Sequence, residues 1–243
     1  MKKFFSFIFL VLILVAFASA DIYIKQKMHT DPVSIMGQNQ PARDLVSEQW
    51  LGDDLFASIS QDQSSIVDLK KNVMYLINHK DKTYLETTLP LDFSKLLPPE
   101  MAGMAAAMMK VTVTVNPTGQ TKTIGQWNCS GYDVSMSMMM MPMKMQVWAT
   151  TDVPFDVNKF MEKMYSNVLM AQLRLDEAAI KEMQKVKGFW IASETSGEMM
   201  GAKIRSTTEV AEISKENPPA GVYSVPAGYT KQEKLSMKQM QQR

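Results

Sequence analysis

The sequence predicts an α+β fold: a curved antiparallel β-sheet, or half-barrel, with helices covering its concave face. Two observations support this expectation. The first half of the chain is a series of short segments in which apolar and polar residues alternate, separated by turn-forming residues. Stretches with helical spacing then follow around residues 156–187 before strand patterns return. Strands that come first and helices that cluster later are typical of an antiparallel α+β plan.

The first twenty residues have the three parts of a secretory signal peptide. Lys2 and Lys3 precede an apolar run at residues 4–17, and Ala18-Ser19-Ala20 provides the small residues of a cleavage site. The run is shorter than the roughly 20 residues that cross a bilayer as a helix. Asp21, and not a lipidated cysteine, follows the expected cut. We therefore expect cleavage after Ala20 and an exported, periplasmic protein with no transmembrane anchor.

The chain after the signal peptide begins as a meander. Links of two to five residues are too short for parallel crossovers, so neighbouring strands should be antiparallel. The expected strands are residues 22–30, 45–51, 55–60, 64–69, 73–78 and 83–89. A short helix is expected at residues 100–110, and further strands at 111–115, 129–138 and 143–150.

Two helices should follow the meander. Asp156 is a suitable N-cap for a helix that runs to about Ala171, and Asp176 for a second helix that ends before Gly188. Strands are expected again at residues 189–195 and 202–213, with a turn at Ser196-Gly197. The resulting domain organisation is a signal peptide (residues 1–20), a single half-barrel domain (21–230) and a flexible polar tail (231–243).

Composition narrows the possible functions. The 26 basic and 25 acidic residues nearly balance, which argues against a nucleic-acid partner because phosphate binding needs a clustered basic surface. Cys129 is the only cysteine, so an intramolecular disulfide is impossible, and we expect this thiol to be buried. His29 and His79 are the only histidines and show no metal-ligand spacing. The sequence therefore favours a protein that is not an enzyme and needs no cofactor.

Methionine is unusually frequent, at 23 of 243 residues. A group lies at Met136, residues 138–141, Met143 and Met145. Thioethers select Cu(I), so copper binding is one hypothesis. Methionine is also flexible and is over-used where a surface adapts to varied apolar partners. Because methionines recur elsewhere in the chain, we favour a soft apolar lining over a metal site.

Several short motifs resemble a family of exported bacterial proteins that carry a domain of unknown function. These motifs span most of the mature chain. They are Ile66-Val67-Asp68, Met74-Tyr75-Leu76, Asp81-Lys82-Thr83-Tyr84, residues 124–132 (IGQWNCSGY), Val147-Trp148-Ala149-Thr150 and Val225-Pro226-Ala227-Gly228-Tyr229. The pattern is similar to the periplasmic lipoprotein carriers of the LolA/LolB type. That resemblance implies a half-barrel and a role in binding a hydrophobic ligand or a lipoprotein.

The leading hypothesis is a periplasmic binding protein that shelters a hydrophobic small molecule or an acyl chain between sheet and helices. Cu(I) binding is one alternative, and a factor in envelope assembly or stress whose partner is an envelope protein is another. The expected ligand-binding residues are Trp50, Phe56, Tyr75, Tyr84 and Trp148 from the strands, and Phe160, Met161 and Met164 from a helix.

Overall fold

The fold is built around one large antiparallel sheet. The computed structural model describes residues 20–35, 37–89, 111–138, 141–163, 177–199 and 201–234. The N-terminal strands are β1 (Asp21–Thr30), β4 (Arg43–Leu51), β5 (Leu55–Ser60), β6 (Gln63–Asp68), β7 (Val73–Asn78) and β8 (Thr83–Thr88). The later strands are β9 (Thr112–Ile124), β10 (Trp127–Met138), β11 (Met141–Thr150), β12 (Phe189–Met199), β13 (Ala202–Glu216) and β14 (Thr230–Gln232).

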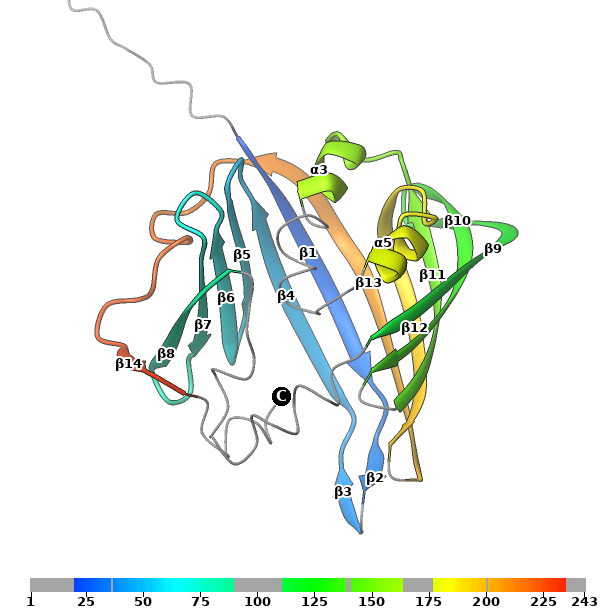
Figure 1. The fold of residues 1–243 in the computed structure, drawn as a ribbon, viewed down its shortest axis with the longest axis horizontal. Helices are drawn as coiled ribbons and strands as arrows, with labels where there is room; N and C mark the ends of the chain where they lie inside the picture. Colours follow the sequence, from blue (N-terminus) through cyan, green and yellow to red (C-terminus); the bar gives the residue numbers. More distant parts are fainter. Residues whose placement is uncertain are drawn as a thin grey trace, which may run out of the picture.

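The strand order shows how the two halves of the chain join. It is β14-β8-β7-β6-β5-β4-β1-β13-β12-β11-β10-β9, so the pairing of β1 with β13 joins the N-terminal strands to the later strands. Among the described strands, only β14 is parallel to its neighbour, β8. A separate hairpin of β2 (Val33–Ile35) and β3 (Gln38–Gln40) projects beyond the sheet (Figure 1). The residues 231 and 232, expected in the tail, pair in β14.

The predicted α+β class is wrong. The described residues are mostly β, in one open sheet, and the helices among them, α3 (Val157–Lys163) and α5 (Glu177–Met183), have seven residues each and do not cover a concave face. The described residues are mostly β because the later strands are longer than the sequence led us to expect. β9 and β13 extend over 13 and 15 residues, because their polar and apolar positions alternate and one side can remain in water.

Hairpin chemistry explains why the expected strands of the meander form. The loops after β6 and β7 both begin with a side chain that accepts a backbone N–H three residues on: Asp68 from Lys71 and Asn78 from Asp81. Both loops end on a residue with positive φ, Asn72 at 53° and Lys82 at 50°. Such tight links impose antiparallel pairing, as predicted.

Other expectations have mixed outcomes. The helix expected at 100–110 lies outside the described residues. Asp156 does cap a helix, because its Oδ1 accepts the N–H groups of Asn158 and Lys159 at 3.0 and 3.1 Å. The turn expected at Ser196-Gly197 is wrong, since both residues lie within β12 and pair with Arg205 and Ile204 of β13.

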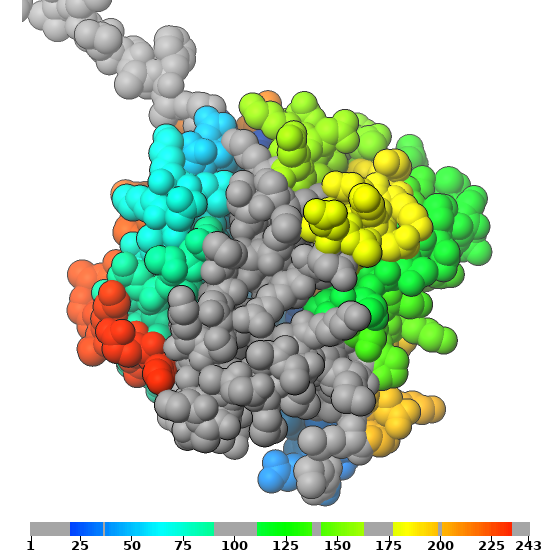
Figure 2. Space-filling model, viewed as in Figure 1, coloured from blue at the N-terminus to red at the C-terminus, as the bar shows by residue number. Residues whose placement is uncertain are grey.

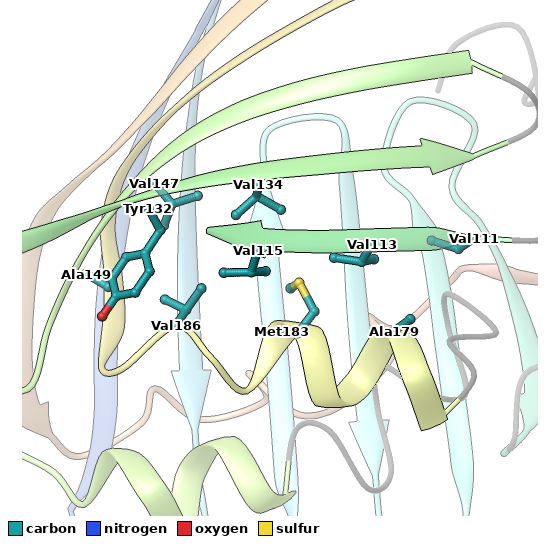
Figure 3. Close-up of a cluster of buried hydrophobic side chains, with 10 residues drawn as sticks. All are labelled: Val111, Val113, Val115, Tyr132, Val134, Val147, Ala149, Ala179, Met183 and Val186. Carbon is teal, nitrogen blue, oxygen red and sulfur yellow. The ribbon is translucent and has the colours of Figure 1, made fainter. Parts of the chain in front are cut away.

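One face of the sheet, here called the helix face, carries α3 and α5. α5 packs on β9 to β11, and Figure 3 shows Ala179 and Met183 pointing from this helix toward Val113 and Val115. Near α3 a second cluster contains Ile24, Ile191 and Val210, each at most 2% exposed. Burial of this size is the main favourable contribution to folding, at about 25 cal/mol per Å².

The opposite face, here called the tail face, is covered by the C-terminal segment over the N-terminal strands. Side chains alternate along a strand, so Met74 and Leu76 point to the helix face whereas Tyr75 and Ile77 point to the tail face. The tail-face cluster is completed by side chains of the segment before β14. They are Val222, Tyr223, Val225 and Tyr229.

Candidate functional site

Helix α3 is held on the sheet by three aromatic rings. Phe155, Phe160 and Phe189 meet edge to face, with ring centroids 5.5 to 5.7 Å apart. Such tilted aromatic pairs add about 0.5–1.5 kcal/mol each beyond the area that they bury. Phe160 lies inside α3 and Phe189 begins β12, so the rings fix the position of the helix over the sheet. A cavity lies on each side of α3.

The larger cavity, the interhelical cavity, lies between α3 and α5 and has a volume of about 710 Å³. Figure 2 shows the two helices as neighbours on one side of the molecule. Apolar side chains from both helices and from the segment after α5 line the cavity: Val157, Met161, Ile180 and Val186. Polar residues, among them Asn158, Gln184 and Lys187, complete its lining. Its volume lies within the range of about 300–1,000 Å³ that is usual for small-molecule sites.

The chain returns from α5 to the sheet beside this cavity. Val186 is 4% exposed and packs with Tyr132 in the same cluster, and the Tyr132 hydroxyl accepts the N–H of Lys187 at 3.1 Å. Gly188 follows with φ at +111°, and it contacts the backbone of Thr150 so closely that a Cβ would overlap it. This rigid return holds one wall of the cavity.

The smaller cavity, the aromatic cavity, lies on the other side of α3 and has a volume of about 300 Å³. Its apolar lining is formed by Ile22, Leu51, Phe56, Phe155 and Phe160. Charged residues stand around them: Asp21, Asp53, Asp156, Lys159 and Lys215. It is therefore a smaller and more highly charged site than the interhelical cavity.

The structure brings together some of the expected ligand-binding residues and separates others. Phe56 and Phe160 line the aromatic cavity, and Met161 lines the interhelical cavity. Trp50, Tyr75 and Tyr84 belong to the cluster of the tail face. These three side chains therefore point away from the two cavities beside α3, and a role for them in ligand binding stays a prediction.

Trp148 and Met164 stand apart from these groups. Trp148 packs beside Gly131, where a Cβ would come within 3.0 Å of the indole, and the Lys122 ammonium lies 5.6 Å from its ring centroid. Its strand neighbours Val147 and Ala149 instead enter the cluster under α5. Met164 lies outside the described residues.

Three apolar lining residues, Val157, Ile180 and Val186, were not among the expected site residues. Ile180 was recognisable in the sequence as an inward position of the second helix, but helical spacing alone does not separate a cavity wall from a filled core. Val186 follows α5 and is not part of a helical or alternating spacing of apolar residues in the sequence. Only the three-dimensional arrangement shows that Ile180 and Val186 face Met161 across a cavity.

The methionine group is resolved in part. Met136 pairs directly with Met143 across β10 and β11, and Met145 lies two residues farther along β11 on the same face. Met136, Met145 and Met161 pack against the cluster that contains Met183. The side chains of residues 138–141 lie outside what the structure describes. Within the described part, methionines thus act as packing residues, and whether they bind Cu(I) stays a prediction.

The described side chains that could take part in catalysis include both histidines and the cysteine. Among the described residues, no group of three His, Cys, Asp or Glu side chains is placed to hold a metal ion. His79 Nε2 lies 2.6 Å from Ser64 Oγ, and its Nδ1 lies 2.9 Å from the hydroxyl of Tyr229. These bonds join the β7–β8 loop to the C-terminal segment. Cys129 is 1% exposed, and burial raises the pKa of its thiol, so the thiolate is disfavoured.

The fold and the cavities define a class: an antiparallel β-sheet protein with a ligand-sized cavity between two short helices. A family model described as a domain of unknown function, DUF4412, matches residues 56–229. The chain therefore belongs to the DUF4412 family. A search of curated proteins finds no match. None of the helices in the described residues has the length and apolar character needed to cross a membrane.

Proposed function

We propose that this protein is an exported, non-enzymatic binding protein that shelters an apolar ligand, such as an acyl chain, in the interhelical cavity. The observation that carries the proposal is the lining itself: Val157 and Met161 of α3 face Ile180 of α5 across about 710 Å³. Each methylene group transferred from water to such a lining contributes about 0.8 kcal/mol. Ten methylenes would therefore suffice for strong binding even after the cost of ordering the chain.

The polar residues around the cavity favour an amphipathic ligand. Lys187 and Gln184 supply an ammonium and a carboxamide, and Asn158 stands at the α3 side. A fatty acid or a lipid would place its chain against Met161 and Ile180 and its polar end near these groups. The flexible thioether of Met161 would let the site accept chains of different shape. A role like that of the lipoprotein carriers is consistent with this ligand class.

Export is part of the same proposal. β1 begins at Asp21, directly after the expected cleavage site, and Ala20 is exposed. The Asp21 carboxylate accepts the hydroxyl of Tyr223 at 2.5 Å, so the fold uses the first residue of the proposed mature chain. N-terminal sequencing of protein recovered from the periplasm should therefore begin at Asp21, and a different first residue would contradict the proposed cut.

A titration with a fluorescent long-chain fatty acid tests the ligand-binding proposal. Ile180→Gln places a polar amide in the cavity wall, and we expect the fatty acid to bind at least about 10-fold more weakly, which corresponds to about 1.4 kcal/mol. Lys181→Gln is the matched control, because Lys181 is the next residue of α5 and is exposed. It should bind as the unaltered protein does.

Thermal unfolding of both variants separates lost binding from lost folding, since Ile180 also packs partly against the cluster under α5. Absence of fatty-acid binding by the unaltered protein, or equal binding by the unaltered protein and folded Ile180→Gln, would remove the proposal.

A further inference from the structure

A third cavity, here called the polar pocket, lies on the helix face away from α3 and α5. Its volume is about 280 Å³, and it is formed where β1, β4 and β7 approach the β5–β6 and β7–β8 loops. Met28 and Leu45 are opposite each other in the β1–β4 ladder and form an apolar wall. Arg43, Asp62 and Lys80 line the same pocket and carry its charge.

The two cations both contact the same carboxylate. Arg43 Nη2 and Lys80 Nζ each lie 2.8 Å from the same oxygen, Oδ2 of Asp62. The hydrogen bond from Lys80, together with the positive charges of Lys80 and Arg43, holds the pKa of the Asp62 carboxyl below its usual value. Asp62 is therefore ionised near neutral pH, and the group of Arg43, Lys80 and Asp62 has two positive charges and one negative charge.

Asp62 is less exposed to solvent than the two cations that contact it. The side chain of Asp62 is 20% exposed, whereas those of Arg43 and Lys80 are each 56% exposed. The carboxylate is thus the most buried of the three groups, and both cations are accessible to solvent. A guanidinium has five N–H donors and an ammonium three, and the bonds to Asp62 use one from each group. Each cation can offer further donors to a second anion.

We propose that the polar pocket binds an anionic oxygen group of the phosphate or carboxylate class, held between Arg43 and Lys80. Asp62 orients the two cations and partly neutralises them, so it lowers the affinity for the anion while fixing the geometry. The apolar wall of Met28 and Leu45 gives such a group room for an attached hydrocarbon chain. The anion can come from a lipid headgroup or from a free phosphate. This inference does not depend on acyl binding between α3 and α5.

Calorimetric titration of the full mature protein with inorganic phosphate and with dodecyl phosphate below its micellar concentration tests the proposal. Arg43→Gln and Lys80→Gln should each weaken binding of the dodecyl compound about 5- to 20-fold. Asp62→Asn should strengthen it at least about 3-fold, because it removes the competing negative charge. Lys70→Gln is the matched control, since Lys70 forms an exposed ion pair with Asp54 in another loop.

Each outcome decides between the possible sources or overturns the site. Similar affinities for the two probes would identify a free phosphate as the ligand, and much tighter binding of dodecyl phosphate would identify a lipid headgroup. Binding that is equal in Arg43→Gln, Lys80→Gln and the unaltered protein would overturn the proposal, as would no binding by the unaltered protein and Asp62→Asn. Ile180→Gln should bind inorganic phosphate normally, so failure at one cavity is distinguishable from failure at the other.

Discussion

At the scale of single residues, Gly188 shows how one position supports the interhelical cavity. It joins α5 to β12 with a φ of +111°, a value that suits glycine and strains other residues. It also presses against the backbone of Thr150 at the end of β11. The sequence indicated a glycine at the end of a helix, but the contact with Thr150 depends on strands that are 38 residues apart in the chain.

Gly188→Ala should therefore be strongly destabilising. The added Cβ would overlap the carbonyl group of Thr150, and backbone atoms cannot move aside cheaply. We expect a loss of at least about 2 kcal/mol in the free energy of unfolding, measured by urea denaturation. Gly119→Ala is the control, because Gly119 has a φ of +72° with nothing within 4 Å of a Cβ. It should cost only about 1 kcal/mol, and equal losses in the two variants would contradict the proposed overlap.

Single residues also show the limit of prediction from sequence. Asp156 was identifiable as an N-cap, because capping depends on neighbours a few residues away. The aromatic residues were identifiable as buried, but their face was not. Trp50 and Phe56 were expected in one site, yet they point to opposite faces of the sheet. The face of a strand residue depends on which elements later cover that face, and those elements are distant in sequence.

At the scale of elements, different contacts cover the two edge strands of the sheet. At one edge β14 adds a short parallel strand to β8, and Lys231 pairs with Glu86 at 2.9 Å. At the other edge, Glu182 of α5 accepts the N–H of Val115 in β9 at 2.9 Å. Exposed strand edges promote pairing between molecules, so both contacts protect against aggregation. The contact of Glu182 also fastens α5, and with it one wall of the interhelical cavity.

This contact should make stability depend on pH. The Lys185 ammonium at 2.5 Å, and then the Val115 N–H, hold the pKa of Glu182 below its ordinary value of 4.5. A carboxyl whose pKa is lower in the folded state stabilises the protein above pH 4.5, and that stabilisation is lost as the pH falls through the folded-state pKa. Glu182→Gln should therefore be less stable than the unaltered protein at pH 7, and the difference should shrink toward pH 3.

Urea denaturation at several pH values measures this difference. Glu177→Gln serves as the control, because Glu177 is an exposed residue in the first turn of the same helix. A constant difference between Glu182→Gln and the unaltered protein from pH 7 to pH 3 would show that the charge of Glu182 does not fasten α5 to β9.

The strands of the first half were predictable from local sequence, and the later strands were predicted less completely. Short loops such as residues 69–72 and 79–82 force antiparallel hairpins, and local turn chemistry reveals them. The later strands were expected to be shorter than they are. β12 continues through Ser196 and Gly197 because these residues pair with β13, and such pairing depends on contacts between strands and not on local turn preference.

At the scale of the whole molecule, the sheet supplies a rigid frame and α3 and α5 supply the walls of the proposed site. β1 pairs with β13, and the segment before β14 covers the tail face, so segments from the early and the late part of the described chain stabilise the same sheet. The segment before β14 is further joined to the sheet by the hydrogen bonds of Tyr229 with His79 and of Tyr223 with Asp21. Within the part of the chain that the structure describes, α3 and α5 have seven residues each and form two sides of the interhelical cavity.

The most direct test of the acyl-chain proposal is photolabelling of the mature protein with a long-chain fatty acid that carries a diazirine near the end of its chain. Peptide mapping by mass spectrometry locates the label. The proposal predicts labelling at residues 157–161 and 180–186, and competition by unlabelled fatty acid. Labelling that resists competition, or that falls on the tail face around Tyr75 and Tyr84, would contradict an acyl-binding site between α3 and α5.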